Sequence, residues 1–470
     1  MGLTKDELLL LVRKGARSMS WQEKLRLTFL LSLPAIMAQI STVAMQIIDV
    51  AMLGRLGTQQ AASVGIVSTT IWLLGGLCTA FASGFSVQVA HRVGADDLQG
   101  ARNIVRQGMT AGLLFGLLLT FVGLSIAPHL PLWLGADEAI RHDASEYLSV
   151  VALALPVLLL NTLAAGCLRC SGNIKVPSML NALMCVLDVL FNYCFIFILD
   201  MGTLGAALGT FAAFIVSMIL MTCYLVGYDQ RLRFSLDKSA TSFRPTAEAL
   251  RNAFVIGSPI GLERGVMCGA QIAVTSIIAP MGPVSIAANT FAIEIEGLCY
   301  MPGYGIAEAT TTLVGQSAGA RRKDLMRSFA WMAMGMGMSV MALMAVLMAV
   351  FAPEMMSLVT HDREVITLGT DVLRIGAWAE PMFAASIVAY GAFVGSGRTL
   401  IPSLLNLGSI WIVRLSLAFT LAPLMGLRGV WVAMCIELCW RGAVLTLRLF
   451  GRSWSQESID EVKEEVKIKV

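Results

Sequence analysis

Twelve long apolar stretches run through this chain, and they restrict what it can fold into more than any other feature. Each is about as long as an α-helix that crosses a bilayer, which needs roughly 20 predominantly apolar residues. Short segments rich in glycine, proline and charge separate them, as is typical between spans. The predicted spans cover residues 28–53, 62–89, 104–128, 146–168, 177–199, 203–228, 252–279, 286–315, 326–351, 366–392, 402–425 and 428–449.

The composition agrees with a membrane environment. Hydrophobic residues make up 57% of the chain and charged residues only 14%, whereas soluble domains have roughly 45–50% and 25%. The sequence therefore predicts an all-α integral membrane protein. A net charge of +3 gives no basic surface for nucleic acid. The single C-x-x-C, at Cys167 and Cys170, lacks further ligands for a zinc site, so we expect no metal or organic cofactor.

Positive charge orients the predicted spans. With the N-terminus inside, the inner segments hold 26 of the 34 Lys and Arg residues, and the outer segments hold only Arg55, Arg141, Arg363 and Arg428. The positive-inside rule prefers this arrangement. We therefore expect a multi-pass protein of the bacterial plasma (inner) membrane with both termini in the cytoplasm.

Five regions follow from the spans. We expect a cytoplasmic amphipathic lead-in over 1–27, an N-lobe of six helices over 28–228, and a cytoplasmic linker over 229–251. A C-lobe of six helices over 252–450 precedes a mixed-charge cytoplasmic tail over 451–470, for which a solvated helix or disorder is expected.

The chain also repeats itself at an offset of 225 residues. Its strongest block is CSGNIKVPSMLN, which begins at Cys170, against GSGRTLIPSLLN, which begins at Gly395. Six helices per half give both halves the same topology, so a pseudo-twofold axis along the membrane normal should relate them. Transporters commonly place their site where such repeats meet. The repeat favours a carrier whose two lobes rock about a central cavity, and we expect it to be monomeric and surrounded by lipid.

Ionisable residues inside the spans are the candidates for function, because each costs about 2.5–3.5 kcal/mol to insert. Several have a structural explanation. Glu263 neighbours Arg264, Asp371 lies close to Arg374 in the sequence, and Glu437 and Arg441 have the spacing of a pair on one helix surface.

Asp49 and Asp188 have no such partner, and four polar residues are predicted to meet at their depth. Asn192 lies one helical turn beyond Asp188, and Thr210 lies at a similar depth on the next helix. Two carboxylates, an amide oxygen and a hydroxyl suit a sodium ion, and two nearby carboxyls can instead share a proton. At the positions equivalent to Asp49, Asp188 and Asn192, the second half has Val274, Val413 and Leu417. We therefore expect this site in one half only.

Over essentially its whole length the chain resembles the multidrug and toxic compound extrusion (MATE) family. The resemblance rests on QIIDVAMLGRLG around Asp49, RVGADDLQGAR, LRCSGNIKVPSMLNALMCVLDVLFN and TTLVGQSAGA. It implies an antiporter that expels cationic amphiphilic compounds and drugs as sodium ions or protons enter. It also implies that Asp49 binds the cation with Thr210. The family has Asn and then Asp on helix 5, whereas this chain has Asp188 and then Asn192.

Substrate contacts are expected on the inner faces of the lobes. We assign them to Gln46, Glu263, Gln271, Glu294 and Glu296. The family's helix 7 glutamate corresponds here to Met267, one turn beyond Glu263. The methionine-rich stretch 326–351 has methionine on every helix face, so packing against lipid explains it better than a drug-binding stripe.

Two other functions remain to be weighed. A flippase for lipid-linked precursors should line its cavity with basic residues, but the spans hold nine acidic residues against four arginines. An intramembrane enzyme should carry a catalytic constellation, and the chain has no H-E-x-x-H motif and no histidine within any predicted span. Efflux antiport is therefore the function that the sequence favours.

Overall fold

The computed structural model describes residues 3–14, 18–234, 243–451 and 453–466. These residues form helices joined by short turns, and the described ranges contain no strand. The all-α prediction is therefore confirmed. Part of the expected linker, 235–242, lies outside the described residues, as do positions 1–2 and 15–17 of the lead-in and positions 452 and 467–470 of the tail.

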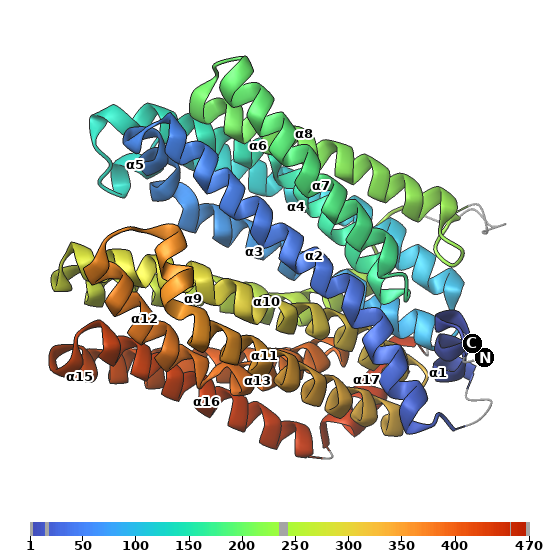
Figure 1. Cartoon of the computed structure of the whole chain (residues 1–470). Coiled ribbons are helices and arrows are strands. Elements are labelled where there is room, and N and C mark those ends of the chain that lie inside the picture. The colour runs from blue at the N-terminus through green and yellow to red at the C-terminus, as the bar shows by residue number, and fades with distance from the viewer. Residues whose placement is uncertain (1–2, 15–17, 235–242, 452, 467–470) are drawn as a thin grey trace. The chain divides into compact units, whose positions relative to one another are not determined.

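Contacts within the chain define two compact units (Figure 1). Unit 2 comprises Ser41–Arg264, and unit 1 comprises Met1–Ile40 together with Gly265–Val470. The boundaries fall inside α2 and α9, so each of these long helices contributes a segment to both units. The predicted lobes 28–228 and 252–450 instead assign each helix whole to one half.

Unit 2 consists of one contiguous segment of the chain. Its elements are the second part of α2 (Trp21–Leu56), α3 (Thr58–Gly94), α4 (Leu98–Ile126), α5 (Leu130–Trp133), α6 (Glu138–Cys170), α7 (Lys175–Tyr193), the π-helix η1 (Cys194–Ile198), α8 (Gly202–Cys223), the π-helix η2 (Tyr224–Tyr228) and the first part of α9 (Ala247–Ile278).

Unit 1 joins the start of the chain to its C-terminal half. Its elements are α1 (Lys5–Lys14), the first part of α2, the end of α9, the 3₁₀-helix η4 (Ala279–Met281), α10 (Pro283–Gly319), α11 (Lys323–Val359), α12 (Arg363–Ala377), α13 (Glu380–Gly395), α14 (Leu400–Gly408), the π-helix η5 (Ser409–Arg414), α15 (Leu415–Met425), α16 (Leu427–Phe450) and α17 (Ser453–Val466).

The spans agree with the predicted count of twelve. Among the described residues, ten helices are long and apolar enough to cross a bilayer, and α12 with α13 forms one further span bent by 55°. The predicted twelfth span corresponds to α10, which has 37 residues and is long enough to cross, but it carries Glu294, Glu296 and Glu308 and is not among these helices. The predicted single span 366–392 is wrong in one respect, because its helix breaks at Trp378 and Ala379.

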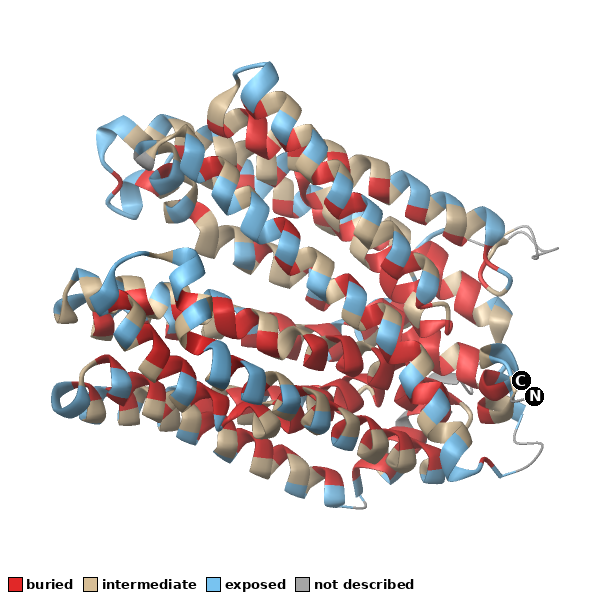
Figure 2. Ribbon diagram, in the orientation of Figure 1, coloured by how far each residue is buried: buried red, intermediate tan, exposed pale blue. Residues whose placement is uncertain are grey.

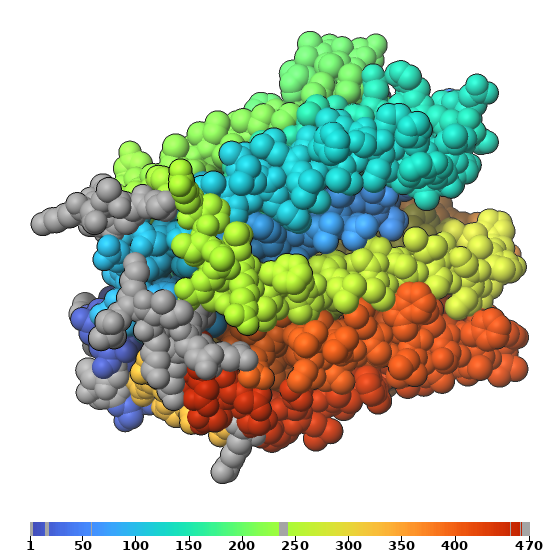
Figure 3. All heavy atoms as spheres, turned by 180° about the vertical axis from the view of Figure 1, so that it is seen from behind, coloured from blue at the N-terminus to red at the C-terminus, as the bar shows by residue number. Residues whose placement is uncertain are grey.

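Large apolar side chains cover the outer surfaces of the helices. On α4, Leu114 is 61% exposed and Phe121 is 71% exposed, and Figure 3 shows this helix beside α6 on one outer face of unit 2 (cyan and teal). Figure 2 shows that exposed, intermediate and buried residues follow one another along the helices. Such surfaces are stable next to lipid chains and costly next to water.

The sequence repeat is also visible in the backbone. Positive φ angles, which L-residues rarely adopt, occur at matching places in both halves at the offset of 225 residues. The pairs are Gly57 (φ 137°) with Gly282 (92°), Asp96 (62°) with Arg321 (58°), and Gly172 (98°) with Gly397 (81°). Corresponding turns are therefore built with the same handedness in the two halves.

Helices α10 and α13 pack backbone to backbone in unit 1. A Cβ added at Gly391 would lie 2.8 Å from the carbonyl oxygen of Ala307, and one added at Gly395 would lie 2.5 Å from that of Thr311. About two turns before Ala307 and Gly391, the rings of Tyr300 and Phe383 meet with centroids 5.4 Å apart. The two helices thus run side by side in one register.

Both terminal helices pack onto unit 1. In α1, Leu8, Leu9 and Val12 are fully buried, and Arg322 donates a hydrogen bond to the Leu11 carbonyl at 3.0 Å. In α17, Trp454 and Ile459 are buried. The described part of the tail is therefore a docked helix, because its apolar side is covered, and the expectation of a solvated or disordered segment is wrong there.

Candidate functional site

Four of the residues predicted to meet do lie together, inside unit 2. Asp49 comes from α2, Asp188 and Asn192 from successive turns of α7, and Thr210 from α8. The Asn192 side-chain nitrogen donates to Asp49 Oδ1 at 2.9 Å, to Asp188 Oδ2 at 3.1 Å and, more weakly, to Thr210 Oγ1 at 3.4 Å. We call these four residues the acidic cluster.

The amide of Asn192 faces the carboxyls with its nitrogen, whereas its oxygen was expected there. The reason is electrostatic, because two carboxyls that approach each other need a donor between them. The Asn192 Oδ1 atom and the Asp188 Oδ1 atom are both buried without a hydrogen-bond partner among the described residues. The acidic cluster therefore has more acceptors than donors.

The acidic cluster is closed off from water on its α7 side. Asp188 and Asn192 are each 1% exposed, while Asp49 and Thr210 are partly exposed. Neither carboxyl forms an ion pair with Lys or Arg within the described ranges. A buried charge normally needs such a partner, so the site is suited to take up a positive ion.

Apolar side chains lie one turn to either side of the cluster on all three helices. In one direction along the helices, Leu53, Ile196 and Ala206 form a buried group. In the other direction, Met45, Met184 and Ala213 form a second one. These layers lower the local dielectric and strengthen every interaction of the carboxyls between them.

Sequence reasoning missed the glycines that make room for this arrangement. A Cβ added at Gly209 would collide with the Asn192 side-chain oxygen and would lie 2.8 Å from its backbone nitrogen. At Gly205, the Phe195 carbonyl oxygen would be 2.8 Å away. The two glycines are four residues apart, which is the small-xxx-small pattern of closely packed helix pairs. This pattern in the sequence could have predicted the close contact between α8 and α7.

A π-helix follows the cluster directly. It covers Cys194–Ile198, immediately beyond the last turn of α7. Such segments often mark functional positions because they rotate the following side chains out of the α-helical register. No sequence pattern predicted it.

The candidate substrate residues are dispersed. Gln46 and Gln271 are exposed, and they belong to unit 2 and unit 1 respectively. Glu263 is 7% exposed and lies in unit 2. On α10, Glu294 is exposed and Glu296 is 5% exposed, because residues two apart on a helix face different directions.

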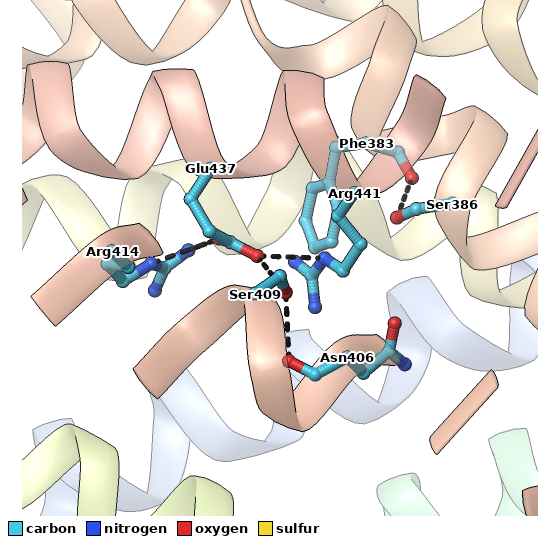
Figure 4. A network of polar contacts seen from close by, with 7 residues as sticks. All are labelled: Phe383, Ser386, Asn406, Ser409, Arg414, Glu437 and Arg441. Carbon is cyan, nitrogen blue, oxygen red and sulfur yellow. Dashed lines mark hydrogen bonds and ion pairs between the residues drawn. The ribbon is translucent and has the colours of Figure 1, made fainter. Parts of the chain in front are cut away.

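Two groups of charged residues in unit 1 form ion pairs. Figure 4 shows Glu437 of α16, whose two oxygens are 2.9 Å from a nitrogen of Arg414 and 3.2 Å from one of Arg441. Ser409 also donates to Glu437 at 2.6 Å. The predicted pairing of Glu437 with Arg441 is thus confirmed. A pairing of Asp371 with Arg374 is wrong, because Asp371 pairs with Arg428 and Arg374 donates to the Ala349 carbonyl.

The donor set restricts which ions could be held. No group of three or more His, Cys, Asp and Glu side chains among the described residues could hold a metal ion, so a tightly bound transition metal does not fit the acidic cluster. The carboxyl and hydroxyl oxygens of Asp49, Asp188 and Thr210 suit a hard monovalent ion, for which oxygen ligands are preferred. Two carboxyls also suit a shared proton.

A duplicated bundle of membrane-spanning helices with buried acidic groups defines a multi-pass membrane protein of the transporter type. A family model described as MatE matches residues 34–194 and again 259–420, once in each half. These matches cover more than half of the chain, so the protein belongs to the MatE family, as the resemblance had indicated.

Individual relatives agree over nearly the full length. A probable multidrug resistance protein NorM of Thermotoga maritima is 24% identical over 449 residues, which cover 92% of this chain and 94% of the relative. One from Chromobacterium violaceum is 26% identical over 433 residues, covering 89% and 92%.

Solved structures share the fold. One is described as the outward-facing conformation of a multidrug resistance MATE family transporter of the MOP superfamily. It superposes with a TM-score of 0.87 at 22% identity and covers 98% of this chain and 100% of its own. A MOP superfamily transporter from Pyrococcus furiosus gives a TM-score of 0.86 with the same coverage and identity.

Replacing Gly209 with alanine tests the close contact behind the cluster. Because the added methyl group must displace the Asn192 side chain, we expect Gly209→Ala to lower the free energy of unfolding by about 1–3 kcal/mol. The measurement is thermal unfolding of the purified protein in detergent. Gly54→Ala is the control, since its Cβ would meet nothing within 4 Å. Equal unfolding temperatures for the two variants would contradict the packing described here.

Proposed function

We propose that this protein is a secondary active multidrug efflux antiporter, which exports organic, mostly cationic amphiphilic compounds in exchange for sodium ions or protons. The observation that carries the proposal is the acidic cluster, in which two buried carboxyls lie together without a basic partner among the described residues. The names of the relatives support drugs as the exported compounds.

Ion binding would change the cluster in a defined way. Without an ion, the Asn192 amide nitrogen bridges the two carboxyls. An ion between Asp49 and Asp188 neutralises their repulsion and takes over the bridging role of that nitrogen. Asn192 can then turn, and because Gly209 leaves no free space behind it, α7 and α8 must shift together. Ion binding would thereby couple to helix packing in unit 2.

Both coupling ions fit the residues present. A sodium ion would take oxygens from Asp49, Asp188 and Thr210, and a rotated Asn192 would add its amide oxygen. A proton would need only the two carboxyls, and the amide nitrogen of Asn192 already contacts both of them, at 2.9 Å and 3.1 Å.

Cationic substrates are favoured over anionic lipid precursors. Two of the arginines within the spans, Arg414 and Arg441, are engaged by Glu437. A flippase that holds a pyrophosphate would need such side chains free. Glu294, which is exposed on α10, is suited to attract a cation, and we propose contacts also from Gln46, Glu263, Gln271 and Glu296.

The setting of the transporter follows from the sequence. We propose the bacterial inner membrane, both termini in the cytoplasm, and a monomer surrounded by lipid. The six-helix halves 28–228 and 252–450 would act as the lobes of alternating access, with 229–251 as their cytoplasmic linker.

Neutralising either carboxyl of the cluster should stop transport. We expect Asp49→Asn and Asp188→Asn each to reduce ethidium efflux from cells to the level of cells without the transporter, because an amide cannot hold the coupling ion. Asp200→Asn is the control, since this exposed residue has a φ of 53°, which asparagine tolerates. Normal efflux by Asp49→Asn at normal expression would contradict the mechanism.

Everted vesicles distinguish the coupling ions. Dye transport should be driven by a sodium gradient or by a pH gradient, and whichever gradient is productive should lose its effect in Asp49→Asn. Vesicles that contain Asp200→Asn should respond as the wild type does. Transport without either gradient, driven by ATP alone, would refute antiport.

Reporter fusions test the orientation. A fluorescent protein fused after Val470 should fluoresce, and alkaline phosphatase at the same place should be inactive, because the positive-inside rule puts this end in the cytoplasm. Phosphatase fused within the short turn near Gly135 should be active. The opposite pattern would reverse the proposed topology.

A further inference from the structure

A groove on the surface of unit 1 takes no part in the sites described so far. It lies between the first turns of α2 and the first half of α11, and its volume is about 600 Å³. Trp21 and Leu25 form its α2 wall, and the face of α11 from Trp331 to Val340 forms the other wall. Among the described residues no acidic side chain lines it, which sets this groove apart from the acidic cluster of unit 2.

Contacts at both ends of the groove fix its shape. At one end, the Lys24 ammonium donates to Ser328 Oγ of α11 at 3.0 Å. Further along α2, Ile36 lies against α10, where a Cβ added at Gly305 would be 2.6 Å from the Ile36 backbone nitrogen. Between these contacts a Cβ added at Gly335 of α11 would meet nothing within 4 Å. The groove is therefore a preformed space that no side chain of the described ranges fills.

The groove runs along the spanning helices from an end that is predicted to be cytoplasmic. Both α2 and α11 begin at that end, after segments assigned to the inside by their positive charge. The stretch from Trp331 to Val340 rises by about 14 Å at 1.5 Å per residue. Because the hydrocarbon core is roughly 30 Å thick, the groove extends over about half of it. Its length thus matches the inner leaflet.

The deep part of the groove suits a hydrocarbon chain. Leu25 and Val340 are aliphatic, and Met332 and Met336 add flexible, polarisable side chains that adapt to irregular apolar surfaces. The Trp331 ring, near the shallow end, is held in place by Phe450, with ring centroids 4.2 Å apart. An acyl chain that lies against this face replaces apolar surface that would otherwise have to pack against disordered lipid.

The shallow end of the groove offers donors and a positive charge. Lys24 forms no ion pair within the described ranges, and the indole N–H groups of Trp21 and Trp331 have no hydrogen-bond acceptor there. The neighbouring acid, Glu23, accepts instead from the backbone nitrogen of Ser20 at 2.9 Å. Tryptophan and lysine at this depth are typical of the level of the lipid headgroups. The groove therefore joins an apolar channel to a cationic, donor-rich end.

We propose that this groove binds one anionic phospholipid of the cytoplasmic leaflet, with its phosphodiester at Lys24 and one acyl chain along α11. A lipid with a net negative charge supplies the counter-charge that Lys24 lacks, whereas a zwitterionic lipid brings its own ammonium group. The same lysine disfavours cationic amphiphiles. The site binds lipid irrespective of whether the protein is an antiporter, so the proposal goes beyond the proposed function and does not depend on it.

Native mass spectrometry of the delipidated protein tests the proposal. We expect the wild type to retain one phosphatidylglycerol about fivefold more tightly than phosphatidylcholine, the effect of roughly one basic side chain near an anionic headgroup. Lys24→Gln should lose this preference, and Gly335→Leu should retain neither lipid because its side chain fills the groove. Lys175→Gln, at an exposed lysine that begins α7, and Gly75→Leu, whose Cβ would also meet nothing within 4 Å, are the matched controls and should behave as the wild type does.

Thermal unfolding in detergent separates loss of binding from loss of fold. Without lipid, Gly335→Leu should unfold at the wild-type temperature or above it, because leucine favours a helix more than glycine does. Phosphatidylglycerol should raise the unfolding temperature of the wild type and of Lys175→Gln, and it should leave that of Gly335→Leu unchanged.

Four results would overturn the proposal. Equal retention of phosphatidylglycerol by the wild type and both groove variants would mean that only the general lipid shell binds. Equal retention of the two lipids by the wild type would mean that Lys24 does not read charge. Displacement of the lipid by soluble glycerol phosphate would identify an anion site that needs no acyl chain. Displacement by ethidium in the wild type would identify a site for cationic compounds.

Discussion

The cost of holding carboxyl groups in an apolar environment organises this protein. Asp49 and Asp188 are kept between two apolar layers and are joined by the amide nitrogen of Asn192. A single donor cannot satisfy two carboxyls. The acidic cluster therefore depends on helices that hold it closely, and it lacks a positive charge, which is the property that the proposed ion coupling uses.

Helix packing supplies the close fit, and it depends on residues without side chains. Gly205 and Gly209 let the backbone of α8 approach α7 at the cluster. In unit 1, Gly391 and Gly395 do the same between α13 and α10. Because interhelical contact in a bilayer relies on close packing and polar contacts, the same glycines that stabilise the bundle also position the carboxyls.

The two units treat their buried charges differently. In unit 1, Glu437 is fully compensated by Arg414, Arg441 and Ser409, and this network has the character of a structural element. Removing one partner of such a network leaves an unpaired buried charge, which is strongly destabilising. The acidic cluster of unit 2 has no such basic partner among the described residues, and on this difference we base the proposal that it responds to an ion.

The sequence by itself determined the number of spans, the repeat and the four residues of the acidic cluster. These follow from hydrophobic length, from a constant offset, and from helix periodicity, all of which are local or linear properties of the chain. Other features depended on contacts between distant segments. They include the break before Glu380, the π-helix after Asn192, the orientation of the Asn192 amide, the pairing of Asp371 with Arg428, and the membership of α2 and α9 in both units. Only the tertiary structure decides these features. For each of them the local sequence allows two or more conformations or partners of nearly equal energy, and the residues that pack against the segment select one.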